Sequence, residues 1–197
     1  MKHIKTIIFG GAFNPPTVDH EAILQACIDY AEKVDADVWV MPSGDRHDKQ
    51  ISVDRSRRLE YIEAMICDSN VSDIVDINIS ELDRKEAVET YITVKELSKA
   101  HPNRSFIWVF GSDSVKTMPS WRNGKWLLNN LDIIAINRRG HELDSSQNHI
   151  AVLDVKMLGT SSTEVRRRLE ANESINGLVG SSVKTIIYQN STRTLAY

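Results

Sequence analysis

Features that would mark several other classes of protein are missing from this chain. Its 197 residues contain no apolar run of transmembrane length, and residues 1–5 lead into a strand-like run without the apolar core of a signal peptide. The formal net charge is −3, far from the basic excess of a nucleic-acid-binding protein. Cys27 and Cys67, the two cysteines, are too few for a disulfide framework, and their helical surroundings predict small core residues. We therefore expect a soluble, cytoplasmic protein with no membrane and no nucleic-acid partner.

Repeats and low-complexity segments are absent as well, and the chain has instead an alternation of strand-like and helix-like runs. Apolar runs predict strands at residues 4–9, 37–41, 74–79, 106–110, 133–136 and 151–155. Helical spacing of apolar residues predicts helices at residues 18–33, 59–66, 88–97, 162–170 and 183–188. The alternation predicts an α/β protein with a doubly wound, mainly parallel sheet and helices on both faces. We expect a single domain over residues 1–197, with residues 160–197 as a small C-terminal helical part.

Open parallel sheets bind ligands beyond the carboxyl ends of their strands, near the point where the strand order reverses. This rule directs attention to three loops that follow predicted strands. They are residues 10–20, called the first loop here, residues 111–121, and residues 159–166.

The first loop combines several features that favour phosphate binding. Gly10 and Gly11 directly follow a strand; without Cβ atoms they permit positive φ and let a ligand approach the backbone closely. Pro15-Pro16 stiffens the end of the loop, and the helix that follows aims its free N–H groups into it. Thr17 offers a hydroxyl before this helix, and His20 lies in its first turn on the inward face. The alternative is an ordinary strand–turn–helix corner capped by Thr17, which the combination of residues disfavours.

The second motif, residues 160–166, gathers hydroxyl groups at a predicted helix start, with Arg166 one turn later. Such a group of donors can hold phosphates. The alternative is an N-cap with Glu164 in the first turn and three arginines, residues 166–168, on a solvated face. The presence of the first loop in the same chain favours the phosphate site, with Arg166 taking part and the next two arginines exposed.

These segments resemble known motifs. Gly10–His20 resembles the signature Gly-x-Phe-(Asp/Asn)-Pro-x-(His/Thr)-x-Gly-His of the nucleotidyltransferase superfamily, with Asp19 in place of the last glycine. Residues 160–166 resemble its second motif, Ile-Ser-Ser-Thr-x-Ile-Arg. Gly111–Trp121 resembles the Gly-Ala-Asp and Leu-Pro-x-Trp segment of bacterial nicotinate mononucleotide adenylyltransferases. With smaller matches at residues 42–49, 55–65, 90–91, 137–140 and 178–197, the resemblance covers nearly the whole chain.

The resemblance implies a Rossmann-like fold and a reaction in the biosynthesis of NAD. ATP and nicotinate (or nicotinamide) mononucleotide would give the dinucleotide and pyrophosphate. Mg²⁺ would arrive with ATP, held mainly by phosphates and water, without a dedicated protein metal site. The sequence leaves the choice between acid and amide open, and it leaves a homo-oligomer open.

The resemblance also implies three sets of site residues. The catalytic residues would be Thr17, His20, Lys49 and Arg166. The ATP-binding residues would be Gly10, Gly11, Ala12, Phe13, His20, Gly111, Asp113, Ser161, Ser162, Thr163 and Arg166. The mononucleotide-binding residues would be Asn14, Lys49, Tyr91, Trp121 and Arg138.

Individual roles follow from the same likeness. Thr17 and His20 would hold the transferring α-phosphate, Arg166 and the helix ends would hold the β- and γ-phosphates, and Lys49 would approach the transition state. Asp113 would lie near the ATP ribose. Trp121 would stack on the pyridine ring, because a flat indole matches a flat, electron-poor ring. The other tryptophans, at positions 39, 108 and 126, fit the core better.

Asp19 is the departure that leaves other functions open. Its carboxylate suits the dipole of the following helix, but beside a triphosphate it would meet like charge. Mg²⁺ or an orientation away from the ligand would make it tolerable, and otherwise catalysis would be weakened or lost. The alternatives are therefore another nucleotidyltransferase, such as phosphopantetheine adenylyltransferase, or a catalytically silent nucleotide-binding protein. A dehydrogenase is disfavoured because no Gly-x-Gly-x-x-Gly follows the first strand.

Overall fold

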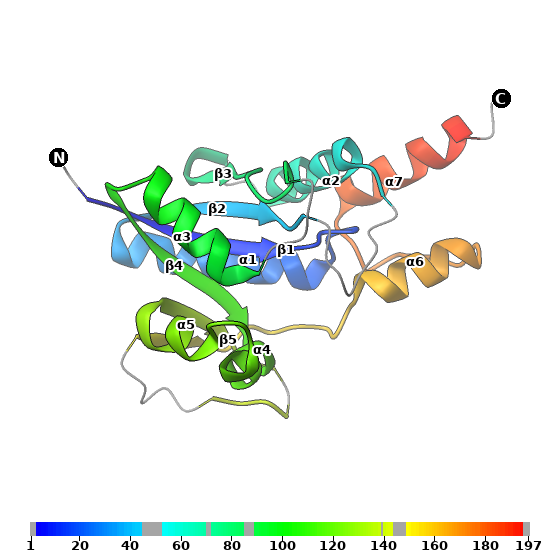
Figure 1. Cartoon of the computed structure of the whole chain (residues 1–197). Helices are drawn as coiled ribbons and strands as arrows, with labels where there is room; N and C mark the ends of the chain where they lie inside the picture. Colours follow the sequence, from blue (N-terminus) through cyan, green and yellow to red (C-terminus); the bar gives the residue numbers. More distant parts are fainter. Residues whose placement is uncertain are drawn as a thin grey trace.

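The computed structural model describes residues 3–44, 53–69, 72–84, 89–138, 140–143 and 149–194 (Figure 1). Within these residues, six strands form one sheet in the order β3-β2-β1-β4-β5-β6, and every neighbouring pair is parallel. The strands are β1 (Ile4–Gly11), β2 (Ala36–Pro42), β3 (Val75–Ile77), β4 (Arg104–Gly111), β5 (Asp132–Ile136) and β6 (Ile150–Leu153). The predicted doubly wound parallel sheet is confirmed.

The strand order reverses between β1 and β4. From β1 the chain moves outward through β2 to β3, then returns to β4 on the other side of β1 and continues to β5 and β6. The two central strands pair from Ile4↔Arg104 to Phe9↔Val109, so their carboxyl ends lie side by side. In such sheets the loops that leave these two ends diverge and form a crevice for ligand.

Helices cover both faces of the sheet, as predicted. One face packs against α1 (Val18–Val34), α2 (Arg55–Asp68) and α7 (Ser181–Thr194). The other packs against α3 (Thr90–Ala100), α4 (Ser112–Thr117), the 3-10 turn η2 (Met118–Ser120) and α5 (Gly124–Asn130). The helix α6 (Ser162–Glu170) lies beyond the carboxyl end of β1 in Figure 1. The 3-10 turn η1 (Ser72–Ile74) precedes β3.

The alternation of side chains along β1 supplies both cores. Ile7 and Phe9 are buried with the α1 helix, whereas Ile8 between them is buried with α3 and α5. Both faces of the central strands are therefore apolar, which is why these strands read as continuous hydrophobic runs.

Several sequence predictions need correction. Cys27 is buried, which raises the pKa of its thiol to about 12, but Cys67 is exposed because it lies off the inward face of α2. The strand predicted at residues 74–79 is only three residues long, and Ile79 is 42% exposed. The helix predicted from residue 88 begins at Thr90, and residue 88 itself lies outside the described residues. In the described part of the chain, no helix is long and apolar enough to cross a membrane.

Candidate active site

The first loop leaves β1 at its carboxyl end, and its glycines do not use the positive φ that the sequence permits. Gly10 and Gly11 are the last residues of β1, and the residue with positive φ is Phe13, at 47°. A Cβ on Gly11 would lie 2.9 Å from the Phe13 ring, so this glycine makes room for the ring. A Cβ on Gly10 would meet only the Met41 carbonyl oxygen at 3.9 Å, and Gly10 is exposed. Its backbone is therefore open to a ligand.

Phe13 anchors the loop in the core and supports His20. Its fully buried ring packs edge-on against Phe9, with ring centroids 5.3 Å apart, and against His20 at 5.4 Å. The positive φ of Phe13 carries a cost for a bulky residue. Burial of the whole ring offsets that cost, and the packed ring restricts the movement of the His20 imidazole.

His20 is held in one orientation by Thr17. The imidazole Nδ1 accepts the backbone N–H of Thr17 at 3.1 Å and lies 2.8 Å from the Thr17 hydroxyl oxygen. Burial lowers the pKa of His20 to about 4; the charge of Asp19 opposes this shift, and that of Arg138 adds to it. The ring is therefore neutral at pH 7. Because Nδ1 is the acceptor, the proton is on Nε2, which is a donor.

Thr17 itself is fully buried, and its hydroxyl contacts His20. The structure thus gives Thr17 an orienting contact with His20, which the sequence did not predict. As the N-cap of α1, it stands at the positive end of a 17-residue helix.

Arg58 holds the backbone of the first loop by a hydrogen bond, a role that was not predicted from the sequence. It is 2% exposed, and its guanidinium donates to the carbonyl oxygens of Ala12 at 2.9 Å and Ser43 at 2.5 Å. A signal was present in the sequence, because Arg58 stands four and seven residues before the buried Ile62 and Met65. That spacing puts the arginine on the inward face of α2.

The second motif is joined to the first loop by two hydrogen bonds to backbone carbonyls. The Ser162 hydroxyl donates to the carbonyl oxygen of Pro15 at 2.8 Å. The Arg166 guanidinium donates to the carbonyl oxygen of Asn14 at 2.6 Å and to the Thr163 hydroxyl at 3.2 Å. Ser161 is the N-cap of α6 and accepts from the N–H of Glu164 at 3.2 Å, so the N-cap of the alternative interpretation is present beside these contacts to the first loop. Two segments about 150 residues apart in sequence thus form one junction.

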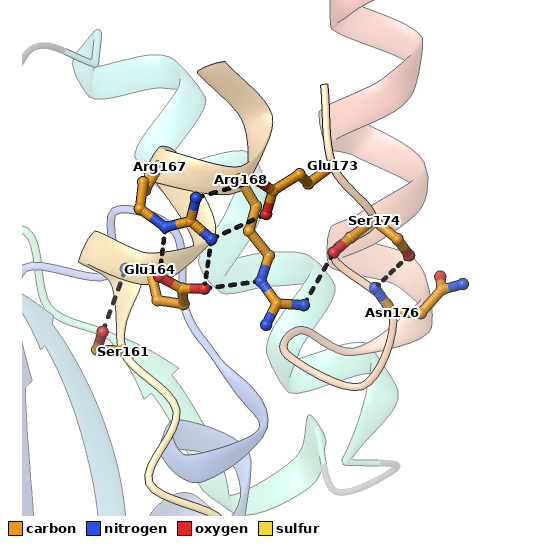
Figure 2. Close-up of polar contacts among 7 residues, drawn as sticks. All are labelled: Ser161, Glu164, Arg167, Arg168, Glu173, Ser174 and Asn176. Carbon is orange, nitrogen blue, oxygen red and sulfur yellow. Dashed lines mark hydrogen bonds and ion pairs between the residues drawn. The ribbon is translucent and has the colours of Figure 1, made fainter. Parts of the chain in front are cut away.

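The two arginines after Arg166 face away from this junction. Glu164 pairs with Arg167 at 2.8 Å and with Arg168 at 2.7 Å (Figure 2). Hydrogen bonds from both guanidinium groups hold the pKa of Glu164 down to about 2. Arg167 also pairs with Glu173, and Arg168 donates to the Ser174 carbonyl oxygen. Arg167 is exposed as predicted, whereas Arg168 is half-buried, so that part of the prediction is wrong.

Asp19 points toward the chain that precedes α6. Its side chain is buried, and its two carboxylate oxygens accept the backbone N–H groups of Leu158 at 2.7 Å and Thr160 at 2.8 Å. The sequence left open whether Asp19 faces the ligand or points away from it. In the structure both of its oxygens accept hydrogen bonds from the protein backbone.

The loop predicted at residues 111–121 is instead helical, with α4 and η2 directly after β4, and an ion pair lies beside Gly111. The Asp113 carboxylate contacts the Arg138 guanidinium at 3.3 Å, and the backbone N–H of Arg138 donates to the Ser112 hydroxyl at 2.9 Å. A Cβ on Gly111 would collide with both charged groups. Trp121 is half-buried and lies edge-on to Phe110, with centroids 5.9 Å apart. This tryptophan therefore retains exposed surface, whereas Trp39 and Trp108 are buried and Trp126 is partly buried.

One residue predicted to bind the mononucleotide, Tyr91, is not brought to this junction. Tyr91 packs edge-on against Trp126 at 5.3 Å, on the face covered by α3 and α5, and Lys95 lies over the Trp126 ring at 4.1 Å. Lys49 lies outside the described residues.

Unpartnered polar atoms mark the same edge of the sheet. Six side-chain atoms in the part of the chain that the structure describes are buried without a hydrogen-bond partner, and three of them are Oδ1 of Asn14, Oδ1 of Asp113 and Oγ1 of Thr160. Buried polar atoms are nearly always hydrogen-bonded, so such atoms in a crevice predict a ligand or water. They come from the first loop, the start of α4 and the second motif, which fall in the three segments selected from the sequence.

A parallel sheet with a neutral histidine, a helix start and an arginine at its switch point defines a nucleotidyltransferase of the Rossmann-like type. The chain belongs to the cytidylyltransferase-like family, whose model matches residues 8–168, and within it to the nicotinate-nucleotide adenylyltransferases. The predicted family and enzyme class are thus confirmed.

Named relatives are similar over almost their whole length. The probable nicotinate-nucleotide adenylyltransferase of Halalkalibacterium halodurans is 30% identical, over 92% of this chain and 87% of its own. The nicotinate-nucleotide adenylyltransferase of Bacillus subtilis is 28% identical, over 93% of this chain and 95% of its own. The solved nicotinic acid mononucleotide adenylyltransferase of Plasmodium falciparum, complexed with NaAD, has a TM-score of 0.74 and 26% identity, over 95% of this chain and 97% of its own.

Proposed function

We propose that this chain transfers the adenylyl group of ATP to nicotinate mononucleotide, releasing pyrophosphate and forming the dinucleotide in NAD biosynthesis. The observation that carries the proposal is the junction of the first loop and the second motif around His20, in a chain whose relatives are nicotinate-nucleotide adenylyltransferases. We also propose that the enzyme is a single domain that works in the cytoplasm on these two small molecules, with no membrane or nucleic-acid partner.

The chemistry requires positioning more than proton transfer. The phosphate of the mononucleotide is an anion at neutral pH, so it attacks the α-phosphorus of ATP without a general base. Charge then grows on the non-bridging oxygens of the α-phosphate, where preorganised donors lower the barrier. A neutral His20 with its proton on Nε2 supplies such a donor, and Thr17 keeps the ring in place.

Arg166 and the N-termini of α1 and α6 are proposed to bind the β- and γ-phosphates. Arg166 uses its guanidinium on Asn14 and Thr163, but this group has five N–H donors, and the remaining ones suit phosphate oxygens. Gly10 and Gly11, at the end of β1, would let the triphosphate lie close to the backbone.

The nucleoside parts of the substrates are assigned to the other loops. Asp113, with one unpartnered oxygen, would accept a ribose hydroxyl of ATP while Arg138 balances its charge. The exposed face of Trp121 would stack on the pyridine ring, and the side chain of Asn14 would hydrogen-bond the mononucleotide. We also propose that Lys49 contacts the mononucleotide and the transition state.

Mg²⁺ is proposed to enter as part of the Mg-ATP substrate. Among the described residues, no group of three or more His, Cys, Asp or Glu side chains is arranged to hold a metal ion. A hard cation bound by phosphate oxygens and water needs few protein ligands, and it neutralises phosphate charge.

The test is release of pyrophosphate from Mg-ATP with nicotinate mononucleotide, nicotinamide mononucleotide or phosphopantetheine as acceptor. We expect turnover with nicotinate mononucleotide, with a kcat/KM at least about tenfold above that of the amide. A preference for phosphopantetheine would replace the proposed substrate. Tight Mg-ATP binding without turnover of any acceptor would show a silent nucleotide-binding protein.

A further inference from the structure

Asp19 stands where the superfamily signature has glycine, and the reaction described above gives it no role. It is the second residue of α1, directly before His20, and its side chain is only 8% exposed. A buried carboxylate is costly unless its oxygens accept hydrogen bonds. Here the two oxygens accept the N–H groups of Leu158 and Thr160 at 2.7 and 2.8 Å, and these charge-assisted bonds are of the stronger kind.

The partner of Asp19 is an irregular stretch that we call the connector, residues 155–160. It links β6 to α6, and each of its residues is at least partly exposed. Val155 and Met157 pack partly against the core. We find two hydrogen bonds from its backbone to the rest of the described chain, and Asp19 accepts both.

The backbone of the connector is shaped for this carboxylate. Gly159 has φ of 78°, a left-handed conformation that other residues rarely adopt, and it lies between the two donating residues. This turn aims two N–H groups, one on each side of the glycine, at a single carboxylate. A Cβ on Gly159 would meet no atom within 4 Å, so the requirement for glycine is conformational and not steric.

The connector leads directly into the proposed ATP site. Thr160 carries a buried hydroxyl without a partner in the described residues, and Ser161 and Ser162 after it cap α6 and contact the first loop. Asp19 therefore joins the helical turn that carries His20 to the chain that presents Thr160 and the N-terminus of α6.

We propose that Asp19 is a positioning residue, which sets the distance between His20 on α1 and the triphosphate-binding end of α6 by holding the connector through Leu158 and Thr160. This inference rests on the proposed function, because it assigns the ATP triphosphate to the second motif. Without the carboxylate, the connector keeps its partial apolar packing but loses both backbone bonds, and the second motif shifts relative to His20. The effect falls on ATP and on the transition state more than on the mononucleotide.

The experiment compares Asp19→Gly and Asp19→Asn with the matched control Asp29→Asn. Asp29 is exposed on the same helix, so its variant removes the same charge without touching the connector. Glycine removes both acceptors, whereas asparagine keeps one acceptor and places an amide donor against the second N–H group. The measurements are kcat and KM for each substrate, Kd for Mg-ATP by calorimetry without acceptor, and amide hydrogen exchange at Leu158 and Thr160.

We expect both Asp19 variants to lower kcat/KM for ATP by about 10²-fold, with KM for the mononucleotide nearly unchanged, because small misplacements of reacting groups have effects of this size. Amide exchange should accelerate at Leu158 and Thr160 and stay unchanged in β1. Gly159→Ala, which strains the same turn, should shift the ATP parameters in the same direction.

Other results would overturn the proposal. Unchanged exchange at the two amides, or ATP parameters equal to those of Asp29→Asn, would show that the two bonds do not position the site. A rise in activity in Asp19→Gly would show that the carboxylate obstructs catalysis. A uniform acceleration of exchange, with both substrates affected equally, would show a purely structural role. If the wild type binds Mg-ATP but turns over no acceptor, the proposed function fails, while the Kd comparison still decides the role of Asp19.

Discussion

The first loop and the connector lie at the same edge of the sheet but are held by different forces. Residues 13–17 of the first loop are all buried. Phe13 lies in the core, and the buried Arg58 donates to the Ala12 carbonyl oxygen. In the connector, residues 155–160, every residue is at least partly exposed, and two hydrogen bonds to Asp19 hold its backbone. Packing thus sets the shape of the first loop, whereas polar contacts to that loop set the place of the second motif. Changes in the loop should cost folding stability or chemistry, and changes in the second motif should mainly cost ATP binding.

Removing the His20 imidazole from the first loop should give the largest effect on catalysis. His20→Ala should lower kcat by roughly 10²–10⁴-fold while Mg-ATP still binds, because the Nε2 donor acts on charge that develops in the transition state. Steady-state kinetics together with calorimetric ATP binding measure both parts. His20→Asn, which retains an acceptor for the Thr17 N–H, separates loss of the helix contact from loss of the donor. An unchanged kcat would remove His20 from the catalytic role.

A steric change in the loop should act on stability. Gly11→Ala puts a Cβ 2.9 Å from the fully buried Phe13 ring, so we expect overpacking to lower the free energy of unfolding by about 1–3 kcal/mol. Gly10→Ala is the matched control, since its Cβ would meet only an atom 3.9 Å away and should change unfolding by less than about 0.5 kcal/mol. Urea denaturation measures both. Equal stability of the two variants would mean that the ring moves aside.

Neighbouring arginines on α6 offer a smaller and more selective test. Arg166→Ala should raise KM for ATP about tenfold, the loss of one charged contact, with little change in unfolding. Arg167→Ala breaks ion pairs with Glu164 and Glu173 on an exposed surface, and such pairs contribute about 0–1 kcal/mol to stability. Its ATP kinetics should match the wild type. If Arg167→Ala impairs ATP binding as much as Arg166→Ala, the phosphate site extends beyond the junction.

The protonation of His20 should stay constant over the neutral range. Burial lowers its pKa to about 4, below the ordinary value of 6.5, so the folded protein takes up fewer protons than the unfolded chain. The contribution of neutral His20 to the free energy of unfolding is fully present above pH 6.5 and is lost as the pH falls toward 4. Ring ¹⁵N chemical shifts should report the Nε2–H form at pH 5.5, and His20→Asn should flatten the acid loss of stability. Titration of the ring near pH 6.5 would contradict the buried, neutral assignment.

The sequence predicts the architecture and the three loops because both depend on local patterns. Apolar runs identified the strands of the sheet, and the predicted span of α6, residues 162–170, agrees with the structure to the residue. Turn residues and hydroxyls after strands located the first loop and the second motif. Such signals lie within about ten residues of one another, so no knowledge of packing is required.

Contacts between distant segments could not be predicted in this way. Nothing local to Asp19 indicates that its partners are Leu158 and Thr160, about 140 positions away. The position of Arg58 in the helical period placed it on an inward face, but not under the carbonyls of Ala12 and Ser43. Gly10 and Gly11 permit positive φ, yet Phe13 is the residue of this loop that has it, because burial of its ring outweighs the backbone preference.

The turn at Gly159 also predicts a pattern of natural variation. A carboxylate at position 19 is useful only if the facing backbone presents two N–H groups, and that geometry depends on a residue free to adopt φ of 78°. Aspartate at position 19 and glycine at position 159 should therefore covary among related sequences. Lineages with glycine at position 19 should be free to vary position 159. The two sites, far apart in the gene, would then evolve as one unit.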